Sequence, residues 1–202
     1  MPKVKVARKS TAVDMTAMCD VAFLLLTFFM LTSNFTVKEP VLVGVPSSIS
    51  EIKIPETNIM TVLVDKDGKI FFGIDGQDYR KELLSGVGEA YSIKFTEEEL
   101  KKFSLIAMQG TPIEQMKTYL KMKVEQRDKP ENTIGIPSDS LNNQFKVWVK
   151  TARKVNPDLR IAIKADQNTP YTMVKSVMTT LQDIDENRYN LITSLEKAPK
   201  GI

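Results

Sequence analysis

The stretch Met15-Thr-Ala-Met-Cys-Asp-Val-Ala-Phe-Leu-Leu-Leu-Thr-Phe-Phe-Met-Leu-Thr-Ser-Asn-Phe-Thr-Val37 decides the fold class of this chain. Its only charged side chain is Asp20. A helix rises about 1.5 Å per residue, so about 20 apolar residues cross a hydrocarbon core of about 30 Å. The stretch is long enough for this, and we therefore predict one transmembrane helix over residues 15–37. The sequence contains no second run of this kind, so we expect the chain to cross the membrane once.

The flanks of this span predict its orientation. Four basic residues precede it against one acidic residue, Asp14, whereas on the far side Lys38 is followed at once by Glu39. The basic residues are Lys3, Lys5, Arg8 and Lys9. Basic flanks stay in the cytoplasm, so residues 1–14 are expected to form a cytoplasmic tail and residues 38–202 to lie on the far side.

A cleaved signal peptide is the alternative interpretation of this segment. Signal peptides also begin with basic residues and continue into an apolar core. The apolar run is too long for one, no small-x-small cleavage site follows cleanly, and Asp20 interrupts the apolar core. These observations favour an uncleaved anchor.

Asp20 is the most informative residue of the span. A carboxylate inside a membrane costs roughly 2.5–3.5 kcal/mol on insertion scales, and such residues commonly mark ion or proton sites that face a partner or a wet cavity. On a helical wheel with about 100° per residue and Asp20 at zero, Thr27 falls at about −20° and Thr16 and Asn34 at about −40°. Leu24 and Leu31 fill the gaps on the same side, as read from the sequence.

Thr16, Asp20, Thr27 and Asn34 therefore form a narrow polar seam on an otherwise apolar helix. The alternative is that the threonine hydroxyls only bond back to their own helix, as they often do in membranes. The alignment of Thr27 with an intramembrane acid favours a functional seam. We therefore expect an ion or proton site around Asp20 on this seam.

The composition of the remainder excludes several classes of function. Residues 38–202 hold 24 basic and 23 acidic residues, a balance that does not favour nucleic acid or a polybasic lipid surface. The chain has one Cys and no His, which excludes disulfide frameworks, Cys/His metal sites and His-dependent catalytic triads. No Gly-rich phosphate loop is present either. We predict that the protein is not an enzyme and has no cofactor other than protons as the coupling ion.

Residues 38–58 are predicted to be a linker, because Pro40, Pro46 and Pro55 interrupt them. Within the linker, Val41-Leu-Val-Gly-Val45 has the composition of an edge strand, which is a natural place for partner docking. A plain linker is the equal alternative. The candidate partner contacts in this segment are Val41, Val43 and Pro46.

An α+β domain is predicted over residues 59–196, with a tail over residues 197–202. Residues 59–64 and 69–74 alternate as a β-hairpin around the turn Asp65-Lys-Asp-Gly68. Helical patterns then cover residues 79–88, 100–108, 112–126 and 141–155, with a capping box beginning at Thr96. Residues of about 88–155 form a predicted helical insertion.

The end of the domain is predicted to be a strand, a helix and a last strand. The strand covers residues 159–165, and the helix runs to about Ile184 with Thr169 as its N-cap and Pro170 as its first residue. The last strand covers residues 189–193. Asp166 and Tyr171 are candidate partner contacts, although a turn residue and a packing residue are the simpler interpretation.

Three segments resemble the ExbD/TolR family. Asp14-Met-Thr-Ala-Met-Cys-Asp20-Val-Ala-Phe-Leu-Leu-Leu-Thr-Phe-Phe-Met30 resembles its membrane signature, Val-Thr-Pro-hydrophobic-hydrophobic-Asp-Val followed by a Leu-rich helix. Val45-Pro46-Ser47-Ser48 is similar to its Leu-Pro-x-Ser segment. Leu159-Arg-Ile-Ala-Ile-Lys-Ala-Asp166, with the Pro170-Tyr171 that follows, resembles its strand, Arg-Ala-Asp and final helix. The resemblance covers roughly residues 10–75 and 155–195, with Ala17 and Lys164 replacing the family's Pro and Arg.

The resemblance implies a fold and a function. The fold is a single N-terminal transmembrane helix plus a periplasmic α+β domain, a small β-sheet with helices packed on it. The function is that of an accessory subunit of a proton-driven inner-membrane motor that energises TonB-dependent outer-membrane transport. On this resemblance Asp20 carries the protons, and Thr16, Thr27 and Asn34 line their pathway. Its implied partners are a ring of ExbB/TolQ-like multi-span subunits, a second copy of the chain and a TonB-like energy transducer.

Other functions remain open from the sequence. One is a TolR-like subunit for outer-membrane integrity, and another is a membrane-anchored periplasmic binding or structural module without proton coupling. A flagellar stator subunit of the MotB type also uses a membrane Asp, but the sequence carries no sign of its large cell-wall-binding domain. A membrane-anchored enzyme has no positive support. The transported cargo and the stoichiometry do not follow from the sequence.

Overall fold

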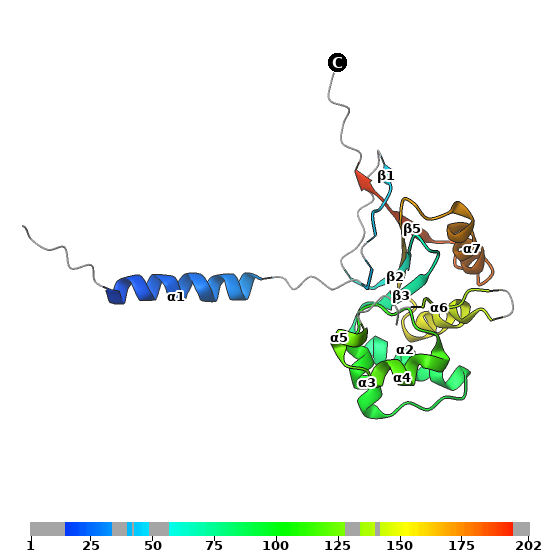
Figure 1. Ribbon diagram of the computed structural model, residues 1–202, viewed down its shortest axis with the longest axis horizontal. Helices are drawn as coiled ribbons and strands as arrows, with labels where there is room; N and C mark the ends of the chain where they lie inside the picture. The colour runs from blue at the N-terminus through cyan, green and yellow to red at the C-terminus, as the bar shows by residue number, and fades with distance from the viewer. Residues whose placement is uncertain are drawn as a thin grey trace, which may run out of the picture. The chain divides into compact units, whose positions relative to one another are not determined.

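The computed structural model divides the chain into two units, Met1–Val37 and Lys38–Ile202 (Figure 1). The residues it describes are 15–33, 40–41, 43–48, 57–127, 134–139 and 142–195.

In the described part of the first unit, residues 15–33, one helix, α1, covers Met15–Thr32. Its 18 residues would extend about 27 Å at about 1.5 Å per residue, and its length and composition suit a membrane span. None of its residues is buried within the chain. The predicted span continued to Val37, but the helix ends at Thr32 and Ser33 is not helical, while residues 34–37 lie outside the described part.

The second unit is built on a four-stranded mixed sheet with the order β3-β2-β4-β5. The strands are β2 (Ile59–Val64), β3 (Ile70–Ile74), β4 (Arg160–Ala165) and β5 (Tyr189–Ile192). β2 pairs antiparallel with β3, whereas β4 runs parallel to both β2 and β5. The predicted hairpin is confirmed, and its turn closes through a 2.8 Å hydrogen bond from the Gly68 N–H to the Asp65 carbonyl oxygen.

Seven helical segments accompany the sheet among the described residues. They are α2 (Gln77–Ala90), α3 (Glu97–Ser104), the 3-10 helix η1 (Ile113–Gln115), α4 (Met116–Lys121), α5 (Val124–Arg127), α6 (Gln144–Val155) and α7 (Tyr171–Gln182). Apolar side chains of α2, α3, α6 and α7 join those of the sheet in one buried core. The small sheet with packed helices agrees with the predicted α+β fold class.

Aromatic side chains join α6 to the sheet and to α3. Trp148 of α6 is fully buried, with its ring centroid 6.1 Å from that of Phe72 on β3 and 6.0 Å from that of Phe103 on α3. Phe145, one turn earlier on α6, meets Phe72 edge to face at 6.3 Å. The last helix of the predicted insertion therefore supplies part of the domain's own core.

Two of the predicted helices differ from those in the structure. The predicted helix over residues 100–108 ends at Ser104, since the chain turns back to pair with the edge of β3: Gln109 N–H donates to Phe72 O at 2.9 Å, and Phe72 N–H donates to Gln109 O at 2.8 Å. The helix predicted over residues 112–126 begins as the 3-10 helix η1, which passes directly into α4. It is then interrupted between α4 and α5, because Met122 adopts an extended conformation.

The start of α7 is also displaced by one residue from the prediction. Pro170 occupies the N-cap position and Tyr171 is the first helical residue. The Thr169 hydroxyl, expected to cap the helix, instead donates to the carbonyl oxygen of Asp65 at 3.1 Å. Thr169 therefore joins the loop after β4 to the turn after β2.

Candidate functional site

The first candidate site is the polar seam of α1. Asp20 lies five residues after the first residue of the helix, or about 7.5 Å along its axis, in the N-terminal third of α1. Thr16 lies one turn before Asp20 and Thr27 about two turns after it, so helical periodicity places all three on one side. Asn34, the fourth predicted member, lies outside the described residues.

Thr27 makes the hydrogen bonds that the alternative interpretation expects. Its hydroxyl lies 3.0 Å from the carbonyl oxygen of Phe23 and 2.9 Å from that of Leu24, so its proton is donated within the helix. Thr32, which lies about 120° away from Asp20 around the helix, donates to Phe28 O at 2.8 Å in the same manner. The hydrogen bonds to the helix backbone therefore do not distinguish Thr27 from Thr32. A threonine hydroxyl that donates its proton in this way can still accept a hydrogen bond at its oxygen, so Thr27 remains able to take part in a polar pathway.

The second candidate site lies in the other unit, where the linker meets the loop after β4. The backbone N–H of Gly44 donates to Asp166 Oδ2 at 2.9 Å, and the N–H of Gln167 donates to the Gly44 carbonyl oxygen at 2.8 Å. Both backbone groups of Gly44 are thus bound by adjacent residues of the loop. We call these two hydrogen bonds the Gly44 clasp.

A short strand pair follows the clasp along the linker. β1 (Ser47–Ser48) pairs in parallel with β6 (Ser194–Leu195), with Ser47 opposite Ser194. The predicted edge strand over residues 41–45 is wrong for the described residues of that segment, because the clasp takes up the N–H and C=O of Gly44. Val41, Val43 and Pro46, the predicted partner contacts in the linker, are half-buried.

Asp166 holds its own loop together as well as the linker. Its Oδ1 accepts from the backbone N–H of Asn168 at 2.9 Å and from the Asn168 side-chain amide at 3.1 Å. The hydrogen bonds from the Asn168 and Gly44 N–H groups lower the pKa of Asp166 below its usual 3.8, because they stabilise the carboxylate. Tyr171, the other candidate contact near this loop, leaves 71% of its surface exposed.

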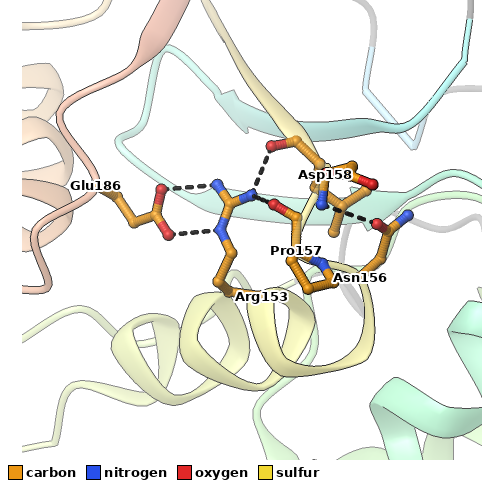
Figure 2. Close-up of polar contacts among 6 residues, drawn as sticks. Arg153, Asn156, Pro157, Asp158 and Glu186 are labelled. Carbon is orange, nitrogen blue, oxygen red and sulfur yellow. Dashed lines mark hydrogen bonds and ion pairs between the residues drawn. The ribbon is translucent and has the colours of Figure 1, made fainter.

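A third polar cluster was not predicted, and it is centred on Arg153 at the end of α6 (Figure 2). The guanidinium donates from Nε and Nη2 to the two carboxylate oxygens of Glu186, at 2.6 and 2.7 Å. Its Nη1 donates to the carbonyl oxygens of Pro157 and, at 2.8 Å, of Leu159. Arg153 therefore ties the end of α6 to the chain that enters β4 and to the loop before β5.

No sequence signal pointed to this cluster. Glu186 lies far along the chain from Arg153, and the other acceptors are backbone carbonyls, which carry no side-chain pattern.

The cluster borders an open polar groove of about 1270 Å³, lined also by Asn58, Arg160 and Arg188. In the described ranges, no group of three or more His, Cys, Asp or Glu side chains is arranged to hold a metal ion.

Comparison with known families decides the relationship that the sequence suggested. The family described as "Biopolymer transport protein ExbD/TolR" matches residues 7–196. The chain belongs to the ExbD/TolR family. The match also includes residues 76–154, which lie between the two regions that the resemblance covers. Searches of curated proteins and of solved structures gave no match.

Membership of the ExbD/TolR family assigns this chain a general role. Its members are single-pass inner-membrane proteins that act as non-enzymatic, energy-coupling subunits of biopolymer transport, in complexes with ExbB/TolQ-like subunits. The helix α1 supplies the apolar segment that such a protein needs. Lys164, which replaces the family's Arg, lies on β4 opposite Leu63 of β2.

Proposed function

We propose that this protein is the proton-coupled accessory subunit of an inner-membrane motor that energises TonB-dependent outer-membrane transport. The N-terminus lies in the cytoplasm and the α+β domain in the periplasm. Asp20 takes up and releases protons, and the seam of Thr16, Thr27 and Asn34 lines the route. The observation that carries the proposal is a lone acid on one polar stripe of an otherwise apolar, unburied helix in a chain of the ExbD/TolR family.

The physical argument for Asp20 is one of charge and environment. A carboxylate inside a membrane is costly, and such residues commonly mark proton or ion routes that face a partner or a wet cavity. A membrane potential contributes about 2.3 kcal/mol per charge per 100 mV, which is enough to bias a group that alternates between a charged and a neutral form. A lone helix cannot enclose a conduit, so this mechanism requires partners. We propose that these are a ring of ExbB/TolQ-like subunits and a second copy of this chain held inside the ring.

The test replaces Asp20 with Asn, which keeps the shape and hydrogen-bonding capacity of the side chain but cannot ionise. We expect the complex to assemble normally and energy-dependent uptake through the outer membrane to be lost. Uptake that survives Asp20→Asn under a pH gradient would refute proton transfer by this residue. Replacing the whole span by an unrelated apolar helix separates this proposal from a merely tethered domain, which would keep its function.

The chain offers a matched pair of variants for the pathway. Thr27→Val and Thr32→Val each remove one hydroxyl that donates back to the helix, but only Thr27 lies on the Asp20 side. We expect Thr27→Val to lower uptake markedly and Thr32→Val to leave it close to the unmodified level. Equal effects would mean that the hydroxyls matter only for the helix itself.

A TolR-like role in outer-membrane integrity is the second candidate. The family description covers both branches, and the geometry of α1 suits either. Cells lacking the protein would then become sensitive to detergents and leak periplasmic contents, while uptake of large nutrients would continue. Comparing the two phenotypes in one deletion strain distinguishes the branches.

A further inference from the structure

The Gly44 clasp changes the length of chain that connects the helix to the folded domain. α1 ends at Thr32 and β2 begins at Ile59, so the whole segment 33–58 separates these elements along the sequence. The clasp fixes Gly44 to the loop after β4, and β1 fixes Ser47 beside β6. Only the segment 33–43, less than half of that length, then separates α1 from the first hydrogen-bonded attachment found among the described residues.

The length of the connecting segment affects how much of a movement of α1 reaches the folded domain. An extended chain spans at most about 3.3–3.6 Å per residue, so the segment 33–58 reaches about 90 Å and the segment 33–43 about 40 Å. A flexible connection takes up displacement by changing its own end-to-end distance, and it does so over a range that grows with its length. A shorter connection therefore passes on more of any movement of the helix.

The place of attachment is suited to receiving a load. Asp166 follows directly after β4, which lies between β2 and β5 in the sheet. Its own N–H donates to the carbonyl oxygen of Val64 on β2 at 3.1 Å, and Thr169 of the same loop donates to Asp65. Force applied at Gly44 thus enters two adjacent strands in the middle of the sheet.

We propose that Asp166 is a positioning residue for energy coupling, which makes Gly44 the point where movement of the anchor enters the domain. The proposal rests on the proposed function, because it requires the anchor to move. It differs from a general structural role for Asp166, since it predicts that the linker behaves differently before and after Gly44. Residues 39 and 51 both belong to the linker, but only the first lies between α1 and the clasp.

The decisive experiment inserts the same short Gly/Ser segment at either of two places in the full-length chain. Insertion after Glu39 lengthens the connection between α1 and Gly44, and we expect it to lower energy-dependent uptake at least tenfold. Insertion after Glu51 lengthens only the chain between the clasp and β2, and uptake should stay within twofold. In the Asp166→Ala background the difference between the two insertions should shrink, because the linker then loses the hydrogen bond to Asp166 but keeps the one from the Gln167 N–H to the Gly44 carbonyl oxygen and the β1–β6 pair. Equal losses from both insertions with Asp166 intact would overturn the proposal.

Two further measurements do not depend on transport alone. Hydrogen exchange of the peptide covering residues 40–48 in the assembled complex should be at least tenfold slower with Asp166 than with Asp166→Ala. Absence of this protection would also overturn the proposal. The second measurement uses a disulfide between Ser47→Cys and Ser194→Cys in the Asp166→Ala protein, with Cys19→Ser to remove the native thiol. The closed disulfide should restore the difference in uptake between the insertion after Glu39 and the insertion after Glu51. Reduction of the disulfide should remove that restored difference. Failure of the closed disulfide to restore that difference would count against Gly44 and β1 as the site of coupling.

The same set of variants separates the two proposals. If Asp20→Asn leaves uptake intact, proton transfer by Asp20 is refuted, whereas slow exchange at residues 40–48 still establishes the clasp. If Asp20→Asn abolishes uptake but both insertions act alike, proton coupling stands and the role of Asp166 in coupling is refuted.

Discussion

Replacement of Arg153 by Met should cost the domain a large part of its stability. Methionine keeps an unbranched stem of comparable length but removes every hydrogen bond of the guanidinium. The Glu186 carboxylate and the carbonyl oxygens of Pro157 and Leu159 would all lose their charged donor. The folded state would then hold a largely buried acid without its partner, at the border of the polar groove.

The size of this effect follows from the exposure of the pair. Breaking a fully buried ion pair costs about 3–5 kcal/mol, whereas a surface pair contributes about 0–1 kcal/mol. The Arg153 side chain is 28% exposed and that of Glu186 17%, so the pair lies nearer the buried limit. We therefore expect Arg153→Met to lower the free energy of unfolding by about 2–3 kcal/mol. For a domain of this size, that loss corresponds to a fall in Tm of about 5–10 °C.

Trp148 provides the assay, because it is the only tryptophan of the chain and is fully buried against Phe72 and Phe103. Its fluorescence in urea or on heating, with the full-length protein in detergent micelles, reports unfolding of the core. Lys81→Met is the matched control, because it breaks an ion pair whose side chains are 43% and 90% exposed. The control should change stability by less than about 0.5 kcal/mol. If both variants lose equally little, the argument from burial is wrong.

Three further predictions concern single features of the domain. Thr96→Ala removes the side-chain acceptor of a complete capping box and should lower the free energy of unfolding by about 1 kcal/mol, measured by urea denaturation. Gly110→Ala would drive a methyl group into the fully buried ring of Phe71 and should cost about 1–3 kcal/mol in the same assay. The pKa of Asp166 in the folded protein is lowered. The stabilisation that its ionised carboxylate gives to the Gly44 clasp is therefore fully present above the usual pKa of 3.8 and is lost as the pH falls through the lowered pKa. The amide resonance of Gly44 should therefore keep its position down to about pH 4 and shift only below it; a shift between about pH 5 and 7 would contradict this assignment.

The local signals of the sequence predict those parts of the fold that are determined locally. The β2–β3 hairpin follows from alternation and a turn sequence within the short segment Ile59 to Ile74, and the capping box of α3 from Thr96 and Glu99. The break between α4 and α5 does not follow, because the residues around Met122 continue a helical pattern and the extended conformation there has no local signature. Asp20 could be identified as a candidate from the sequence because it is the only charged residue in the apolar stretch 15–37.

The linker illustrates why the remaining contacts could not be predicted. The segment 41–45 has the higher local preference for β structure, yet the observed pair forms at Ser47–Ser48. Its partner, Ser194–Leu195, and the clasp residue Asp166 come much later in the chain, so their positions depend on the completed sheet. The same reason explains why the pairing of Arg153 with Glu186 was missed, since Glu186 follows α7 in the chain and meets Arg153 only after the helices have packed.

The central pair of the sheet has a consequence for how the domain is made. β2 and β4 join Ile59 to Arg160 across most of the length of the domain. Sheets with such distant pairing form slowly, since the entropy of closing a long loop opposes them until the last strands arrive. As the ribosome synthesises the chain from its N-terminus, the hairpin must therefore wait with one unsatisfied edge on β2. Chaperones that shield exposed strands at this stage would raise the yield of folded protein, and a permuted chain that makes β4 earlier would need them less.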